Sequence, residues 1–397
     1  MEAFAAVPLV AGLPAMNGAL PRVLFVGAFP APNSPIFGGM VTSCRALLAS
    51  TFSKRVQLEL LDSTQLSNPP PALPVRIVLA ARRLVRFVHA FEARKPDVVL
   101  LFVAVGASIV EKGVMARYAR LRGVPTFMFP RGGSIIDACR ASRFTRAWAR
   151  VAFRGAAKIV CQGQAWRRFA IDTLGFASTD VVVIRNWTAT RELLEVGARR
   201  ETRRELPVRL VFVGWLEREK GIFELIDACR QLHSNRKFTL DIVGDGHASR
   251  EAHVLVTRYG LTEVVRFRGW LQMPELTQTL IDADVLVLPS WAEGLPNAVV
   301  EAMAARLAVV ATGVGAIPDV ITDHRSGLLV TPQDSESLRV AVAEVIDDST
   351  LRERLAGEAY KIAIRDFGVE GAADRLLLEI ENTIASARTT RAFGRGQ

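Results

Sequence analysis

Two glutamates separated by seven residues give the clearest chemical signal in the chain. Glu293 and Glu301 belong to the segment PSWAEGLPNAVVEAM at 289–303, which follows an apolar run and opens a helix. The first N–H groups of a helix have no partner within it and carry partial positive charge, so a phosphate can rest on them. Two carboxylates beside that phosphate can accept hydrogen bonds from hydroxyl groups. The segment indicates a site for a phosphorylated, hydroxyl-bearing ligand, although two incidental acids on a capped surface helix would look the same.

The order of this and other short motifs resembles retaining glycosyltransferases of the GT-B fold, in the large family 4 of nucleotide-sugar-dependent enzymes. Each motif alone is weak, but together they cover nearly all of the second half of the chain. They are VFVGWLEREKG at 211–221, IVGDG at 242–246, FRGW at 267–270, the two glutamates, GVGAIPDV at 313–320 and GLLV at 327–330.

The resemblance assigns roles to the residues that match these motifs. It implies that Lys220 binds the donor diphosphate, that Glu301 holds the ribose hydroxyls and that Glu293 contacts the transferred sugar. A lysine in a strand-to-helix loop suits this role because it can neutralise charge that builds on a leaving diphosphate. The alternative is a solvated lysine at a helix start. Further donor contacts are expected from Arg218, Gly244, Gly294, Leu295, Pro296 and Asn297.

Two positions depart from the family pattern. Trp215 stands where an arginine often follows the glycine, so Arg218 is expected to supply the second positive charge. Arg131, in the segment FPRGG, stands where many members carry a His-Gly pair that borders the acceptor. This departure casts doubt on histidine-assisted proton transfer and points to an anionic group on the acceptor or donor. Gly39, in the first Gly-Gly pair, matches the family's glycine loop, where a backbone can approach a phosphate closely.

The aspartates of Asp282-Ala283-Asp284 have the D-x-D spacing of metal sites in the other major glycosyltransferase fold. They lie where a helix passes into a strand, which favours a structural role. The resemblance implies catalysis without a divalent ion. We therefore expect no metal, and no cofactor besides the nucleotide diphosphate-sugar co-substrate.

All these residues are positioned by short apolar runs, which end at Gly, Pro or Ser turns and alternate with helical stretches. This is the βαβ pattern of a parallel sheet, and ligands of such sheets bind beyond the carboxyl ends of the strands. The predicted fold is α/β, with two doubly wound Rossmann-like domains facing a cleft and a C-terminal helix returning to the first. The expected strands are 22–27, 56–61, 97–103, 124–129, 158–161, 180–184, 210–214, 238–243, 264–269, 285–289, 308–312 and 327–330.

A polar, charged stretch divides the two strand series. We expect a loose N-terminal extension over 1–21, an acceptor-side domain over 22–187 and a linker over 188–207. A nucleotide-sugar-binding domain is expected over 208–365, and a helix and tail over 366–397.

Composition excludes disordered, collagen-like and disulfide-rich proteins, because 50% of the 397 residues are apolar and 23% are charged. The net charge of +10 is divided unevenly. Residues 1–205 carry 29 Lys and Arg against 13 Asp and Glu, whereas 206–397 carry 21 against 27. The first half is therefore expected to face something anionic.

Part of this excess recurs at helical spacing, from Arg140 to Lys158 in one predicted helix and from Arg76 to Arg86 in another. Basic stripes beside apolar faces are typical of helices on anionic lipid, although a solvated helix face has the same pattern. We find no motif that would position nucleic-acid bases, so nucleic acid is not an expected partner. The membrane-facing candidates are Arg143, Arg146, Trp148, Arg150 and Arg154.

Four scattered cysteines without metal or disulfide spacing predict a cytoplasmic protein, and no apolar run approaches the length of about 18 to 20 residues that a transmembrane helix needs. With the basic stripes, we expect the protein to be peripheral on the inner face of the membrane. The predicted function is retaining transfer of a sugar from a nucleotide diphosphate-sugar to a lipid-linked saccharide acceptor, in surface polysaccharide or glycolipid synthesis. The alternatives are an epimerase-like nucleotide-sugar enzyme without external acceptor and a basic, non-catalytic binding protein.

Overall fold

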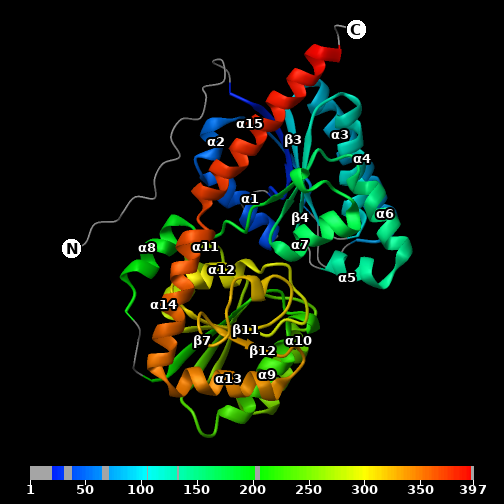
Figure 1. Cartoon of the computed structure of the whole chain (residues 1–397). Coiled ribbons are helices and arrows are strands. Elements are labelled where there is room, and N and C mark those ends of the chain that lie inside the picture. Colours follow the sequence, from blue (N-terminus) through cyan, green and yellow to red (C-terminus); the bar gives the residue numbers. More distant parts are fainter. Residues whose placement is uncertain are drawn as a thin grey trace, which may run out of the picture.

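The protein consists of two α/β domains stacked along one axis (Figure 1). The computed structural model describes residues 20–30, 38–64, 71–104, 106–131, 134–201 and 206–394. The predicted N-terminal extension over 1–21 lies outside these residues except for its last two.

The first domain is built on a parallel six-stranded sheet with the strand order β2-β1-β3-β4-β5-β6. Its strands are almost continuously apolar because helices cover both faces. The strands are β1 (Arg22–Gly27), β2 (Gln57–Asp62), β3 (Val98–Val103), β4 (Thr126–Pro130), β5 (Lys158–Cys161) and β6 (Val181–Val183).

The second domain repeats the plan with the order β12-β11-β10-β7-β8-β9, again all parallel. All twelve strands predicted from the sequence are present, and their bounds differ from the predicted ones by at most two residues at either end. The strands are β7 (Val208–Val213), β8 (Phe238–Val243), β9 (Val265–Gly269), β10 (Val285–Leu288), β11 (Ala308–Thr312) and β12 (Leu328–Val330).

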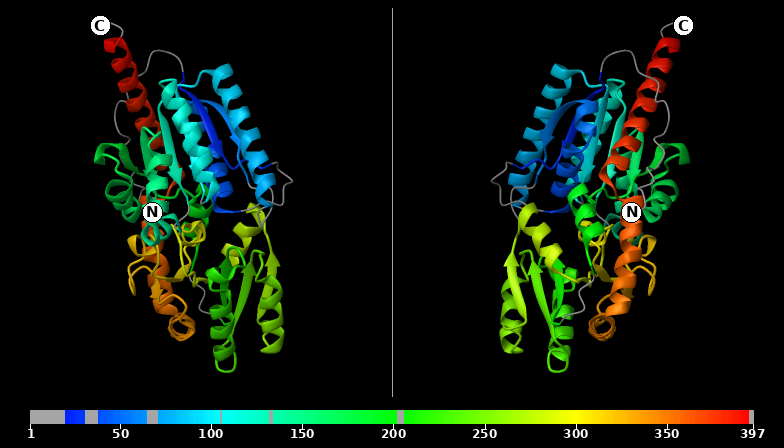
Figure 2. Two further views of the ribbon diagram at one scale, coloured as in Figure 1. Left: turned by 90° about the vertical axis from the view of Figure 1, so that its right-hand side faces the viewer. Right: turned by 90° about the vertical axis from the view of Figure 1, so that its left-hand side faces the viewer.

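Helices connect the strands and cover both faces of each sheet (Figure 2). Those of the first domain are α1 (Gly39–Ala49), α2 (Phe52–Arg55), α3 (Leu73–Arg94), α4 (Ala107–Leu121), α5 (Ser134–Ala141), α6 (Arg143–Phe153) and α7 (Gln164–Arg168). Those that follow are α8 (Arg191–Arg199), α9 (Ile222–Leu232), α10 (Ser249–Arg258), α11 (Met273–Asp282), α12 (Asn297–Ala304), α13 (Ser335–Asp347) and α14 (Ser349–Asp366).

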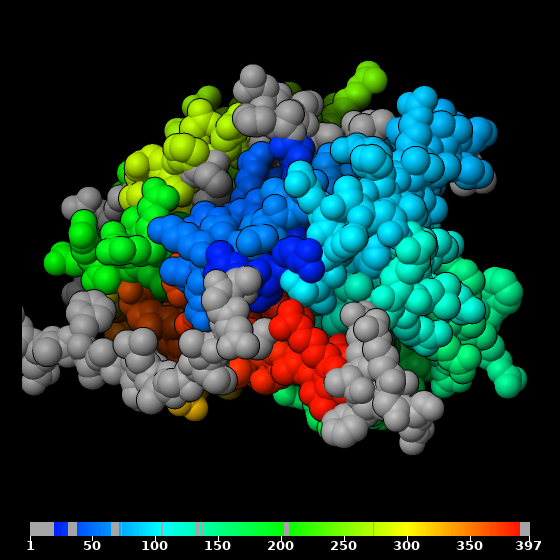
Figure 3. Space-filling model, turned by 90° about the horizontal axis from the view of Figure 1, so that it is seen from above, coloured from blue at the N-terminus to red at the C-terminus, as the bar shows by residue number. Residues whose placement is uncertain are grey.

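The last helix, α15 (Val369–Gly394), returns to the first domain, as the sequence predicts. Its residues Leu376 and Ile380 are buried in the same core cluster as Phe25 of β1. At its start, Glu370 accepts hydrogen bonds from the backbone N–H and hydroxyl group of Thr51. Seen from above, the red helix lies against the blue surface of the first domain (Figure 3). The helix therefore ties the end of the chain to its beginning.

The prediction of one continuous basic helix from Arg140 to Lys158 is wrong. The chain leaves the helical conformation at Ser142, whose side chain accepts a hydrogen bond from the N–H of Thr145 and caps α6. Lys158 begins strand β5. The spacing of three and four residues continues across the break, but the cap divides the stripe between α5, α6 and a strand.

No described helix is long and apolar enough to cross a membrane.

Candidate active site

A cavity of about 340 Å³ lies between the carboxyl ends of the two sheets. Loops and helix starts of both domains line it, which is where ligands of doubly wound sheets bind. Its lining includes Gly39 and Arg131 of the first domain and Lys220, Gly294, Leu295 and Pro296 of the second.

The two residues predicted to be catalytic contact each other in this cavity. The Nζ atom of Lys220 lies 2.6 Å from Oε1 of Glu293. Their side chains are 27% and 10% exposed, so the pair is shielded but can be reached from the cavity. Lys220 ends a 3₁₀ turn over Arg218–Lys220 that follows β7, and Glu293 follows β10. The two strands are neighbours in the sheet, so their loops meet.

Two backbone features fix these loops against each other. The N–H of Trp291 donates to the carbonyl of Glu219 at 2.8 Å. Gly221 has a φ of +71°, and a Cβ atom there would lie 2.1 Å from the carbonyl oxygen of Pro289. Only glycine permits this close approach. Lys220 is thus held beside the loop that carries Glu293.

Glu301 lies in the second turn of α12, which begins at Asn297 after the N-cap residue Pro296. The side chain lines the cavity although only 4% of the residue is exposed. Burial raises the pKa of its carboxyl group to about 7, because the charged form loses hydration. Glu301 therefore holds a proton at higher pH than an exposed glutamate does.

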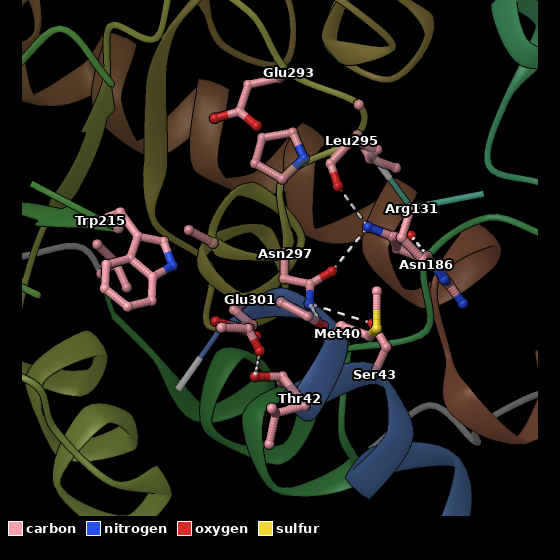
Figure 4. Close-up of a pocket in the computed structure, with 18 of the residues that line it drawn as sticks. Met40, Thr42, Ser43, Arg131, Asn186, Trp215, Glu293, Leu295, Asn297 and Glu301 are labelled. Carbon is pink, nitrogen blue, oxygen red and sulfur yellow. Dashed lines mark hydrogen bonds between the residues drawn. The ribbon is translucent and has the colours of Figure 1, made fainter. Parts of the chain in front are cut away.

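Asparagine side chains join the two domains beside Glu301 (Figure 4). Nδ2 of Asn297 donates to the carbonyl of Gly39 at 2.8 Å. Nδ2 of Asn186, which follows β6, donates to Oδ1 of Asn297 at 2.8 Å and to the carbonyl of Leu295. Gly39 opens helix α1, as predicted, and its carbonyl belongs to this interdomain contact. Asn186 could not be predicted from the sequence, because a single asparagine after a short strand carries no motif.

Arg131 follows β4 and lies across the cavity from Trp215 (Figure 4). Its Nη1 atom donates to Oδ1 of Asn186 at 2.9 Å. The guanidinium carbon lies 4.6 Å from the centroid of the Phe102 ring and 4.3 Å from that of Trp187. Burial lowers the pKa of Arg131 to about 10.

Two predicted donor contacts are not brought into the cavity. Arg218 points toward Glu251, with 3.7 Å between the charged groups, and its side chain is 59% exposed. Gly244 is absent from the described lining, and a Cβ atom there would lie 1.8 Å from the carbonyl oxygen of Gly214. Gly244 therefore has a packing role, and the geometry gives its donor role and that of Arg218 no support.

The aspartates of the D-x-D sequence have structural partners. Oδ2 of Asp284 accepts a hydrogen bond from the N–H of Arg209 at 2.9 Å, and Arg200 lies 3.8 Å from its Oδ1. Within the described part of the chain, no three His, Cys, Asp or Glu residues are grouped so that they could hold a metal ion.

The cavity thus combines Lys220, two carboxylates and the start of a helix, with Arg131 on the side of the first domain. Lys220 and the N–H groups at the start of α12 can hold a diphosphate, and Glu301 can accept hydrogen bonds from hydroxyl groups. Glu293 lies on the other side of the Leu295–Asn297 segment (Figure 4). This is the arrangement that the spacing of the two glutamates predicts.

Comparison with known proteins places both domains in glycosyltransferase families. Residues 198–362 match the model of "Glycosyl transferases group 1", and residues 41–187 match that of the "Glycosyl transferase 4-like domain". A lipopolysaccharide core biosynthesis glycosyltransferase of Rhizobium meliloti is 31% identical over 57% of this chain and 64% of its own length. Other curated relatives align over 42 to 46% of their own length.

Two solved structures share the whole two-domain fold. Sucrose-phosphate synthase from Thermosynechococcus elongatus superposes with a TM-score of 0.76 at 17% identity, over 92% of this chain and 100% of its own. Anabaena HepE in complex with UDP and glucose gives a TM-score of 0.68 at 20% identity, over 91% and 100% of the two chains.

The raised pKa of Glu301 predicts how the free energy of unfolding changes with pH. Below its ordinary pKa of 4.5 the carboxyl group is protonated in both the folded and the unfolded chain, so its burial does not lower the free energy of unfolding by this route. Between pH 4.5 and about 7 the unfolded chain ionises while the folded one keeps its proton, so stability falls as pH rises. Glu301→Gln removes this cost of about 3 kcal/mol. In urea unfolding, the variant should gain stability relative to wild type between pH 5 and pH 8; a difference that is constant with pH would contradict the buried, protonated carboxyl group.

The packing of the Glu293 loop generates a second prediction. Gly315 has a φ of +61°, and a Cβ atom there would lie 2.1 Å from the carbonyl oxygen of Glu293. Gly260 has a similar φ of +68° with nothing within 4 Å, so Gly260→Ala carries only the conformational cost of about 1 kcal/mol. Gly315→Ala should lose at least about 2 kcal/mol more in chemical unfolding, because the loop must move. Equal losses in the two variants would show that no such collision exists.

Proposed function

Because this chain belongs to the group 1 glycosyltransferase family, we propose that it transfers a sugar from a nucleotide diphosphate-sugar to a saccharide acceptor in surface polysaccharide or lipopolysaccharide synthesis. The observation that supports the proposal most is the contact of Lys220 with Glu293 in the cavity that also contains Glu301. A lysine and two carboxylates at the start of a helix match what a sugar nucleotide presents: charged phosphates between two sets of hydroxyl groups.

The donor site follows from the geometry of α12. The diphosphate lies on the N–H groups at the start of the helix and replaces Glu293 as the partner of Lys220. The carboxylate of Glu301 accepts hydrogen bonds from the ribose hydroxyls. Glu293, freed from Lys220, accepts hydrogen bonds from the hydroxyls of the transferred sugar. Charge that builds on the leaving diphosphate is stabilised by groups already in place.

We propose that transfer retains the configuration at the anomeric carbon. The bond between that carbon and the diphosphate oxygen breaks, and a bond to the acceptor oxygen forms on the same face. The acceptor proton passes to the departing diphosphate oxygen. Glu293 then orients and stabilises the sugar, and no protein nucleophile is needed. Closure of the cleft between the two domains, which meet at Asn186 and Asn297, would expel water from around the activated sugar.

The two alternatives have less support from the cavity. An epimerase-like enzyme needs an acid and a base of its own on the first domain. Among the described residues that line the cavity, however, the carboxylates are Glu293 and Glu301, both on the second domain, and there is no histidine. A non-catalytic binding protein would have no use for an assembled pair of Lys220 and Glu293.

We further propose that the first domain binds an anionic membrane that carries a lipid-linked acceptor. The neighbouring helices α3, α4 and α6 form one flank of the first domain (Figure 1). Large apolar side chains on this flank are exposed, among them Val85 at 69%, Phe144 at 81% and Val151 at 61%. Exposed Arg143 and Arg154 accompany them on and just beyond α6. An exposed apolar surface with a basic border suits an anionic lipid interface.

Three of the predicted membrane-facing residues have other roles. Trp148 packs against the core of the first domain. Arg146 donates to the carbonyl of Cys139 at 3.1 Å, and Arg150 donates to the carbonyl of Thr173. Phe144, which was not among those candidates, is far more exposed than Trp148. The membrane proposal therefore rests on the apolar residues more than on the basic stripe.

Replacing Lys220 or Glu293 with alanine should abolish transfer while the fold survives. Each change removes a group that acts on the reacting part of the donor, so kcat/KM should fall by about 100-fold or more. Lys361 and Glu358 are a matched control, because they form a surface pair with the same separation of 2.6 Å. Lys361→Ala should leave turnover within about twofold. Near-normal turnover in both site variants would refute the assignment.

Vesicle sedimentation tests whether this flank of the first domain binds an anionic membrane. The full chain should bind vesicles that contain phosphatidylglycerol better than pure phosphatidylcholine, and added salt should weaken binding. Phe144→Glu combined with Val151→Glu should lower binding to the anionic vesicles by roughly tenfold or more. Val254→Glu, on the second domain and 59% exposed against 61% for Val151, is the control. Binding by the double variant at the wild-type level would contradict the proposal.

A further inference from the structure

One edge of the Arg131 guanidinium has no partner. Nη1 donates to Asn186, but Nε and Nη2 are buried without a hydrogen-bond partner among the described residues. A buried donor that makes no hydrogen bond is costly, and more so when it carries charge. Because Arg131 lines the cavity, its unpaired Nε and Nη2 atoms indicate a ligand that accepts their hydrogen bonds.

The same edge binds carboxylates elsewhere in this chain. Nε and Nη2 of Arg83 donate to the two oxygens of Glu111 at 2.7 and 2.8 Å. Arg339 uses the same two atoms on Glu336, at 2.7 and 2.5 Å. Two parallel N–H groups on one side of the guanidinium match the two oxygens of a carboxylate. In Arg131 the same two N–H groups, which we call the fork, have no acceptor among the described residues.

No described side chain is available to fill it. The carboxylates that line the cavity are Glu293, which is paired with Lys220, and Glu301, whose burial raises its pKa to about 7. The guanidinium is also fixed in place, because the rings of Phe102 and Trp187 both lie within 5 Å of its central carbon. The two ring centroids lie 6.1 Å apart, so the rings pack on adjacent sides of the guanidinium. Because the proposed donor diphosphate lies at the start of α12 beside Lys220, a carboxylate of the substrate is the anion left for these two N–H groups.

We propose that Arg131 binds the carboxylate of an acidic sugar and so makes this enzyme selective for a carboxylate-bearing substrate. The inference rests on the proposed function, because it places a sugar in the cavity. Through Asn186, Arg131 is connected to Leu295 and Asn297 in the loop that follows Glu293. A sugar bound at that loop can extend its carboxylate to Arg131. The carboxylate can belong to the donor, as a hexuronic acid, or to the acceptor.

The test compares charged and neutral partners in two arms. In the donor arm, calorimetry measures the Kd of the full chain for UDP- and GDP-glucuronic acid against UDP- and GDP-glucose. In the acceptor arm, transfer to a membrane extract is compared before and after its carboxylates are converted to amides. One arm should show a preference of at least about 100-fold for the carboxylate, and the arm that shows it identifies the source.

Arg131→Met should reduce that preference to less than about fivefold, whereas Arg131→Lys, which keeps the charge but loses the fork, should retain part of it. The unfolding midpoint and the Kd for the free nucleoside diphosphate show whether each variant is folded. A purely structural role would lower stability and affect charged and neutral substrates equally. The proposal fails if neither arm discriminates, or if Arg131→Met keeps the preference. If the wild-type chain transfers no sugar at all, the proposed function fails instead.

Discussion

The amide of Asn186 is the contact on which the geometry of the cavity depends. It is 2% exposed and makes four hydrogen bonds: it donates to the carbonyl of Leu295 and to Asn297, and it accepts from Arg131 and Gln162. Each buried group would be costly if left without a partner. The first domain can therefore satisfy Asn186 only when the loop after Glu293 lies against it. The hydrogen bonds of Asn186 therefore fix both the relative position of the two domains and the position of the loop after Glu293.

In the second domain, the charged side chains of the cavity are also held by contacts within the protein. Lys220 and Glu293 come from loops of neighbouring strands, and each neutralises the other in the absence of ligand. Because both side chains are partly exposed, a diphosphate could replace Glu293 as the partner of Lys220, and a sugar hydroxyl could replace Lys220 as the partner of Glu293. Glu301 is different, because burial alone raises its pKa and no cation offsets the cost. Ribose hydroxyls that donate to Glu301 would stabilise its ionised form, so donor binding and ionisation of Glu301 favour each other.

Much of this could be predicted from the sequence. The strands are nearly continuous apolar runs, which a buried parallel sheet requires, and the two glutamates lie in a loop and helix whose order is visible in the chain. The direction of single side chains could not be predicted. Arg218 is close in sequence to Lys220 but stacks on Phe223 outside the cavity. Asn186 acquires its role only when a residue over one hundred positions away comes within hydrogen-bond distance. The prediction of one continuous basic helix is wrong because periodicity does not reveal the capping residue Ser142.

A crystal structure of the chain with a bound nucleoside diphosphate tests the central claim most directly. We predict that the diphosphate lies at the start of α12, with a phosphate oxygen about 3 Å from Nζ of Lys220. The ion pair of Lys220 with Glu293 should be separated, and the carboxylate of Glu301 should accept hydrogen bonds from the ribose. A nucleotide bound outside this cavity, or inside it with the ion pair intact and Glu301 away from the ribose, would contradict the account.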